Sequence, residues 1–81
     1  MAMVTVHRAH GFQFTIFAND HAPPHIHVFG QGGEAKIDLL PGGDVVVTWT
    51  NGIARADLRR ILAEARDQHK MLSRAWERMH G

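Results

Sequence analysis

The stretch Phe12-Gln13-Phe14-Thr15-Ile16-Phe17 sets apolar side chains at alternate positions. Successive side chains of a strand point to opposite faces, so Phe12, Phe14 and Ile16 predict a strand with one buried face. Asn19-Asp20 ends this strand, because both side chains bond readily to nearby backbone in turns. The stretch therefore predicts a sheet that is packed on one side.

Four more extended segments flank this strand, at residues 4–7, 25–29, 34–39 and 45–49. The turn residues Ala9-His10-Gly11 predict a hairpin between the first two strands. Gly30-Gln31-Gly32-Gly33 predicts a second hairpin. It lacks the Gly-Lys-Ser/Thr ending of a phosphate-binding loop and leads into a strand, so it is not interpreted as one. Pro41-Gly42-Gly43-Asp44 predicts the turn before the last strand.

The final third of the chain has a helical period. Its apolar stripe, widened by Leu62 and Trp76, keeps its phase through one polar position, Gln68, and consists of Leu58, Ile61, Ala65, Leu72, Ala75 and Met79. The spacing predicts a helix from near Ala54 to about Arg78 without a Ser or Thr cap. The expected fold is α+β, a curved antiparallel sheet of about five strands with one long C-terminal helix packed on it, and a single domain over residues 1–81.

Composition narrows the class of protein. The 81 residues are 44% apolar and include no cysteine, which excludes disulfides and thiolate chemistry. No run is long and apolar enough for a membrane span, and the first residues lack the apolar core of a signal peptide. We therefore expect a cytoplasmic protein without membrane contact. A domain of this size has a thin core, which a homodimer would help to stabilise.

Positive charge is concentrated in the predicted helix. The arginines that recur on its polar side are Arg55, Arg59, Arg66 and Arg74. They predict a solvated face or, alternatively, a contact face for nucleic acid or an acidic partner. The pI of about 8.5 lies below the value above 9 typical of a dedicated nucleic-acid domain. Trp49 and Trp76 are expected in the core or an interface, and His69 and His80 at the surface.

The most distinctive segment is Asn19-Asp20-His21-Ala22-Pro23-Pro24-His25-Ile26-His27. His25 and His27 are two apart in a predicted strand, so their imidazoles lie on one face and could chelate a metal. The stiff Pro-Pro bend could fold His21 back beside them, and Asp20 could ligate directly or orient a histidine. Asp20, His21, His25 and His27 together predict a site for a divalent metal such as zinc, with an open position.

Two other interpretations of this segment stay open. Without a metal, His25 or His27 could act as catalytic acid and base on a phosphate backbone, with Arg8 or Lys36 stabilising the developing charge. Alternatively the prolines and turn residues are structural, and the histidines form a patch that faces a partner. Histidine-triad chemistry is not indicated, because position 29 is Phe29 where a third alternating histidine would stand. Both an enzyme and a non-enzymatic binding protein therefore follow from these residues.

Nearly the whole chain resembles a known family. The resemblance runs from Phe12-x-Phe14 through Asp20-His21-Ala22-Pro23-Pro24-His25-Ile26-His27-Val28 and Gly32-Gly33-Glu34-Ala35-Lys36 to Leu58-Arg59-Arg60-Ile61-Leu62 and Trp76. It is similar to short bacterial proteins of unknown function with an Asp-His-x-Pro-Pro-His-x-His-Val signature. Ala54 departs from the pattern, since relatives usually offer a serine near this helix start.

What the resemblance implies is a partner. Members of that family are commonly encoded beside a second small protein, in an arrangement like that of toxin–antitoxin modules. The leading hypothesis is therefore a component of a bacterial two-protein, toxin–antitoxin-like module that acts by protein–protein contact, with a connection to nucleic acid. The alternative hypothesis is a histidine- or metal-dependent nuclease or phosphoesterase centred on His21, His25 and His27.

Overall fold

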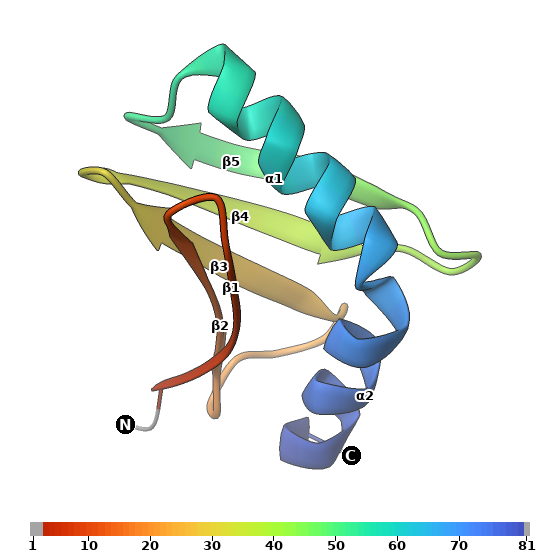
Figure 1. Cartoon of the computed structure of the whole chain (residues 1–81). Coiled ribbons are helices and arrows are strands. Elements are labelled where there is room, and N and C mark those ends of the chain that lie inside the picture. The colour runs from red at the N-terminus through yellow and green to blue at the C-terminus, as the bar shows by residue number, and fades with distance from the viewer. Residues whose placement is uncertain (1–2, 81) are drawn as a thin grey trace.

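A computed structural model describes residues 3–80 of the chain. Five antiparallel strands form one sheet in the order β1-β2-β3-β4-β5, so every strand pairs with its neighbours in the sequence. The elements are β1 (Met3–Ala9), β2 (Phe12–Phe17), β3 (His25–Gly30), β4 (Gly33–Leu39), β5 (Val45–Asn51), α1 (Arg55–Asp67) and α2 (His69–His80). Figure 1 shows α1 lying along β5 and β4, with α2 continuing past them. The predicted α+β class and the five antiparallel strands are confirmed.

Two turns of the same kind join the strands at one end of the sheet. His10 and Gly11 connect β1 to β2 with φ angles of 56° and 81°, and Gln31 and Gly32 connect β3 to β4 with 50° and 78°. Two successive residues with positive φ are the requirement of a type I′ turn, whose twist matches that of the flanking strands. Both predicted hairpins are therefore confirmed, and the glycine-rich segment is a turn.

The core lies between one side of the sheet and the helices. Phe14, Ile26 and Ile37 come from three adjacent strands and have no exposed surface. Ile61 of α1 and Leu72 of α2 are equally buried and belong to the same apolar cluster. Burial of an apolar side chain of this size stabilises the fold by about 1.5–3 kcal/mol. Phe12, Phe14 and Ile16 of β2 are buried as the alternation predicted, but Thr15 on the opposite face is buried as well.

The single long helix that the periodicity predicted is wrong in one respect. The helix breaks at Gln68, whose φ of −101° and ψ of 14° end α1 before α2 begins. The hydrogen bonds Gln68 N–Glu64 O and Leu72 N–Gln68 O are both 2.9 Å long, so the break is a one-residue bend rather than a gap. Side chains on both sides of the bend reach the β4–β5 turn: Arg66 contacts Asp44, and His69 contacts Leu40 O. These contacts favour a change of direction at this point.

The start of α1 agrees with the sequence. Ala54 is the N-cap residue and makes no side-chain capping bond, while Asp57 places a carboxylate in the first turn. A negative charge there interacts favourably with the helix dipole. Neither helix of residues 3–80 is long and apolar enough to cross a membrane.

Candidate functional site

The two histidines of β3 lie on the side of the strand that faces away from the main core. Ile26 and Val28 point into the core, so the alternation of a strand places His25 and His27 on the opposite side. His25 is nevertheless buried, with 5% of its surface exposed, and His27 is half-buried. The loop between β2 and β3 carries Asp20 to them.

Asp20 and the two histidines converge on one point. The Nε2 atoms of His25 and His27 lie 2.9 Å and 3.3 Å from the same carboxylate oxygen, Oδ2 of Asp20. One ligand atom from each of the three residues lies within 4.8 Å of the others. Three of the four predicted site residues are therefore brought together. His21, the fourth, lies in a neighbouring pocket.

An oxygen lies near the far nitrogen of each imidazole, but only the far nitrogen of His25 is hydrogen-bonded. His25 Nδ1 lies 2.9 Å from Pro23 O, and because a carbonyl oxygen only accepts, this nitrogen carries the hydrogen. In the neutral ring, Nε2 then presents a lone pair toward Asp20. Two acceptors repel one another unless a proton or a metal ion lies between them. His27 Nδ1 lies 3.4 Å from Glu34 Oε2, at ion-pair distance but without the geometry of a hydrogen bond.

Aromatic side chains fix the planes of both imidazoles. The ring of His27 stacks on Phe17 with centroids 4.5 Å apart and planes at 7°. The ring of His25 lies 5.0 Å from that of Trp76, a buried residue of α2. Rings held in this way lose little rotamer freedom when they bind a ligand, so the pair is preorganised.

Carboxylates outnumber the neighbouring lysine. Asp38 is the strand partner of His25, and Lys36 is that of His27. With Asp20 and Glu34, three carboxylates surround the imidazoles against one ammonium group. This balance favours a bound cation over a bare anion.

Unsatisfied polar atoms gather around the same pair. Among residues 3–80, the buried side-chain atoms without a hydrogen bond are Thr15 Oγ1, His27 Nδ1 and Asp38 Oδ1. Thr15 is the β2 partner of His27, and Asp38 is the β4 partner of His25. Buried polar groups normally have partners, so their concentration here indicates a place where a polar ligand or water binds.

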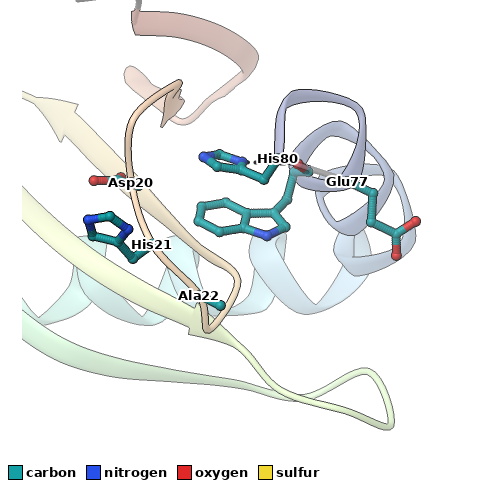
Figure 2. Close-up of a pocket in the computed structure, with 6 residues that line it drawn as sticks. Asp20, His21, Ala22, Glu77 and His80 are labelled. Atoms are coloured by element: carbon teal, nitrogen blue, oxygen red, sulfur yellow. Dashed lines mark hydrogen bonds between the residues drawn. The ribbon is translucent and has the colours of Figure 1, made fainter.

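A surface pocket of about 280 Å³ opens beside Asp20. Figure 2 shows the loop with Asp20, His21 and Ala22 passing the end of α2 that carries His80, while Glu77 points away from the loop. The imidazole of His21 is exposed and lines this pocket. Asp20 belongs to both the cluster and the pocket wall, whereas His25 and His27 do not line the pocket.

The predicted arginine face is divided. Arg66 Nε lies 3.1 Å from Asp44 Oδ1, and the exposed members of this face on α1 and α2 are Arg55, Arg59 and Arg74. The backbone N–H of Val45 and the Arg66 guanidinium lower the pKa of the Asp44 carboxyl. Arg66 therefore stabilises the β4–β5 turn through its ion pair with Asp44.

The expectation that His69 and His80 are ordinary surface residues is wrong. His69 Nε2 lies 2.7 Å from Leu40 O, and His80 Nε2 lies 3.0 Å from Phe17 O. Each imidazole contacts a carbonyl oxygen that the helix meets only after the chain has folded back. Periodicity along the helix carries no signal of these contacts. The nearness of Glu34 and Asp38 to the histidines could have been inferred from the predicted hairpin register.

Residues 11–77 match the family model described as a domain of unknown function, DUF4160. The chain belongs to this family. The match includes the whole of the Asp20–His25–His27 cluster and most of both helices. No curated protein and no solved structure was found to match the chain.

Proposed function

We propose that this chain is a metal-dependent hydrolase of phosphoesters, of the nuclease or phosphoesterase class, whose divalent metal is held by Asp20, His25 and His27. The observation that carries the proposal is the convergence of both Nε2 atoms on Asp20 Oδ2, at 2.9 Å and 3.3 Å. Pro23 O supports the opposite nitrogen of His25, and Glu34 Oε2 lies 3.4 Å from the opposite nitrogen of His27 without a hydrogen bond. Histidines that bind metals usually have such a carbonyl or carboxylate behind them.

Two of the three separations between ligand atoms, those that involve Asp20, suit a zinc-type ion. With ligands at 2.0–2.1 Å in a tetrahedron, neighbouring ligand atoms are about 3.3 Å apart. The His27–Asp20 separation already has this value, and the His25–Asp20 separation of 2.9 Å is a few tenths of an ångström short. Three protein ligands leave a fourth position open, as in catalytic zinc sites.

The neighbouring residues suit hydrolysis. A metal held there would lower the pKa of a bound water and polarise a phosphoryl oxygen. Lys36, the strand partner of His27, is the basic side chain beside the cluster on the same side of the sheet and would bind a phosphate oxygen. His21 lines the adjacent pocket and would donate a proton to the oxygen that leaves when water adds to phosphorus. The carboxylate surplus disfavours a metal-free version of this chemistry.

The test is metal content and cleavage of the untagged, full-length chain. We expect about one equivalent of zinc or a similar metal by elemental analysis, and cleavage of a single-stranded RNA or a chromogenic phosphodiester. His25→Ala and His27→Ala should each abolish both. His10→Ala is the matched control, because this imidazole is 42% exposed and lies outside the cluster. Wild-type protein without metal, and with activity equal to that of both variants, contradicts the proposal.

A second function, contact with a partner protein, is supported by the edges of the sheet. Within residues 3–80, the large apolar side chains that are exposed are Met3, Val4, Val46 and Trp49, and all four belong to β1 or β5, the two edge strands. An open edge with apolar side chains is a place where a further strand can pair. This agrees with the small partner protein of a toxin–antitoxin-like module, or with a homodimer.

Co-purification tests this second function. The chain and the product of the neighbouring gene should form a complex at micromolar concentration, and Trp49→Ser should weaken it while Lys70→Ser, at an exposed position of α2, should not. Sedimentation of the chain alone tests the homodimer. Equal complex formation by both variants contradicts a role for the β5 edge. Contact of nucleic acid with Arg55, Arg59 and Arg74 predicts affinity that falls steeply as salt rises.

A further inference from the structure

The last turn of α2 contacts the turn that presents Asp20. His80 Nε2 lies 3.0 Å from Phe17 O, and the backbone N–H of Asp20 donates to the same oxygen over 3.2 Å. Phe17 O is therefore a shared acceptor that joins the end of α2 to the backbone of a proposed ligand. His80 lies one residue from the end of the chain, whereas Asp20 lies between β2 and β3.

The same helical turn also contacts a second proposed ligand. The ring of His80 stacks on Trp76 with centroids 3.7 Å apart and planes at 17°, and His80 Nδ1 lies 3.0 Å from Trp76 O. The Trp76 indole in turn lies 5.0 Å from the ring of His25. The indole is thus in contact with both His80 and His25. Two of the three proposed ligands are supported by the last turn of α2.

We infer that Trp76 and His80 are positioning residues for the site, so that docking of the last turn of α2 and metal binding strengthen each other. This inference rests on the proposed metal site. The last turn of a helix frays readily, because its carbonyls lack helical partners. When the turn is docked, Asp20 and His25 are held where their ligand atoms meet. Linkage is reciprocal, so a bound metal stabilises the docked turn by the same factor.

The test uses three variants of the full-length chain. His80→Ala removes the donor to Phe17 O. His80→Gln keeps an N–H donor that can reach the same oxygen. His69→Ala is the matched control, because His69 also lies on α2 and donates to a carbonyl, Leu40 O at 2.7 Å, but contacts no proposed ligand. Zinc affinity is measured by competition with a chelator, and hydrogen exchange of the amides is followed with and without zinc.

We expect His80→Ala to weaken zinc binding by about 10–100-fold, as loss of a residue that orients metal ligands does. His80→Gln should recover most of the affinity, and His69→Ala should stay close to wild type. Zinc should slow exchange of the amides of residues 77–80 in the wild type and not in His80→Ala. Without metal, the Asp20 amide should exchange faster in His80→Ala than in His69→Ala.

The outcomes distinguish the positioning role of His80 from the existence of the metal site. Equal zinc affinity of His80→Ala and wild type overturns the positioning role and leaves the metal site standing. A wild type that binds no zinc overturns the proposed function and with it the linkage. In that case exchange of the Asp20 amide, measured without metal, still tests whether His80 holds this turn, and equal rates in His80→Ala and His69→Ala overturn that claim too. If His80→Ala does not fold, His80→Leu, which keeps a side chain of similar size but has no polar atom, replaces it in the same comparisons.

Discussion

Zinc should raise the melting temperature of this chain by an amount that depends on His27. A metal that binds only the folded state adds RT ln(1 + [L]/Kd), or about 2.7 kcal/mol at a free zinc concentration 100 times Kd. Unfolding entropy near 60 °C is about 2.1 cal/mol/K per residue, which gives about 170 cal/mol/K for 81 residues. The expected rise in Tm is therefore about 16 °C.

His27→Ala removes one of three ligands and the ring that stacks on Phe17. If affinity falls by about 100-fold, the same zinc concentration equals the new Kd, and the stabilisation shrinks to about 0.4 kcal/mol, or about 2 °C in Tm. The assay is differential scanning fluorimetry with and without zinc, and each variant is compared with its own metal-free Tm. His10→Ala should keep the full rise. A wild-type rise below about 2 °C, or equal rises in wild type and His27→Ala, would refute the reasoning.

Two further predictions concern the scaffold. Gly33→Ala should lower stability by about 1–3 kcal/mol, measured by urea unfolding, because its Cβ would lie 2.5 Å from Gly52 O, a backbone atom; an unchanged midpoint would mean that these two segments are farther apart. The Val45 N–H and Arg66 lower the pKa of the Asp44 carboxyl in the folded state. The ionised carboxylate therefore stabilises the fold at a pH above the unfolded pKa of about 3.9. This contribution is lost as the pH falls through the folded pKa. Asp44→Asn should therefore reduce stability at pH 7 more than at pH 3, and an equal loss at both would contradict this account.

Most of the fold could be predicted from local patterns in the sequence. The alternation through Phe12, Phe14 and Ile16 identified a strand and its buried face, because burial repeats with the geometry of the strand. The bend at Gln68 could not be predicted in this way, since the helical hydrogen bonds continue through it and the apolar stripe keeps its phase. The change of helix direction at Gln68 depends on contacts with the β4–β5 turn, which lies more than twenty residues earlier in the chain.

The candidate site, too, could be predicted from the sequence only in part. The spacing of His25 and His27 was sufficient to place both on one side of a strand. Asp20 could be suggested as a neighbour because the connection is short. The role of Trp76 was not visible, because an indole in an apolar stripe looks like any core residue until the path of the chain brings it to His25.

The bend at Gln68 also restricts how relatives with this site can differ in length. Each residue added to or removed from an α-helix rotates everything after it by about 100° and shifts it by about 1.5 Å. One such change between Ile61 and Trp76 would keep α1 in place but turn the indole away from His25. A change in the turn around Gly42 and Gly43, where added Cβ atoms would meet nothing within 4 Å, would leave that alignment untouched. Chains that keep the site should therefore vary in length at residues 41–44 and hold the helix spacing constant.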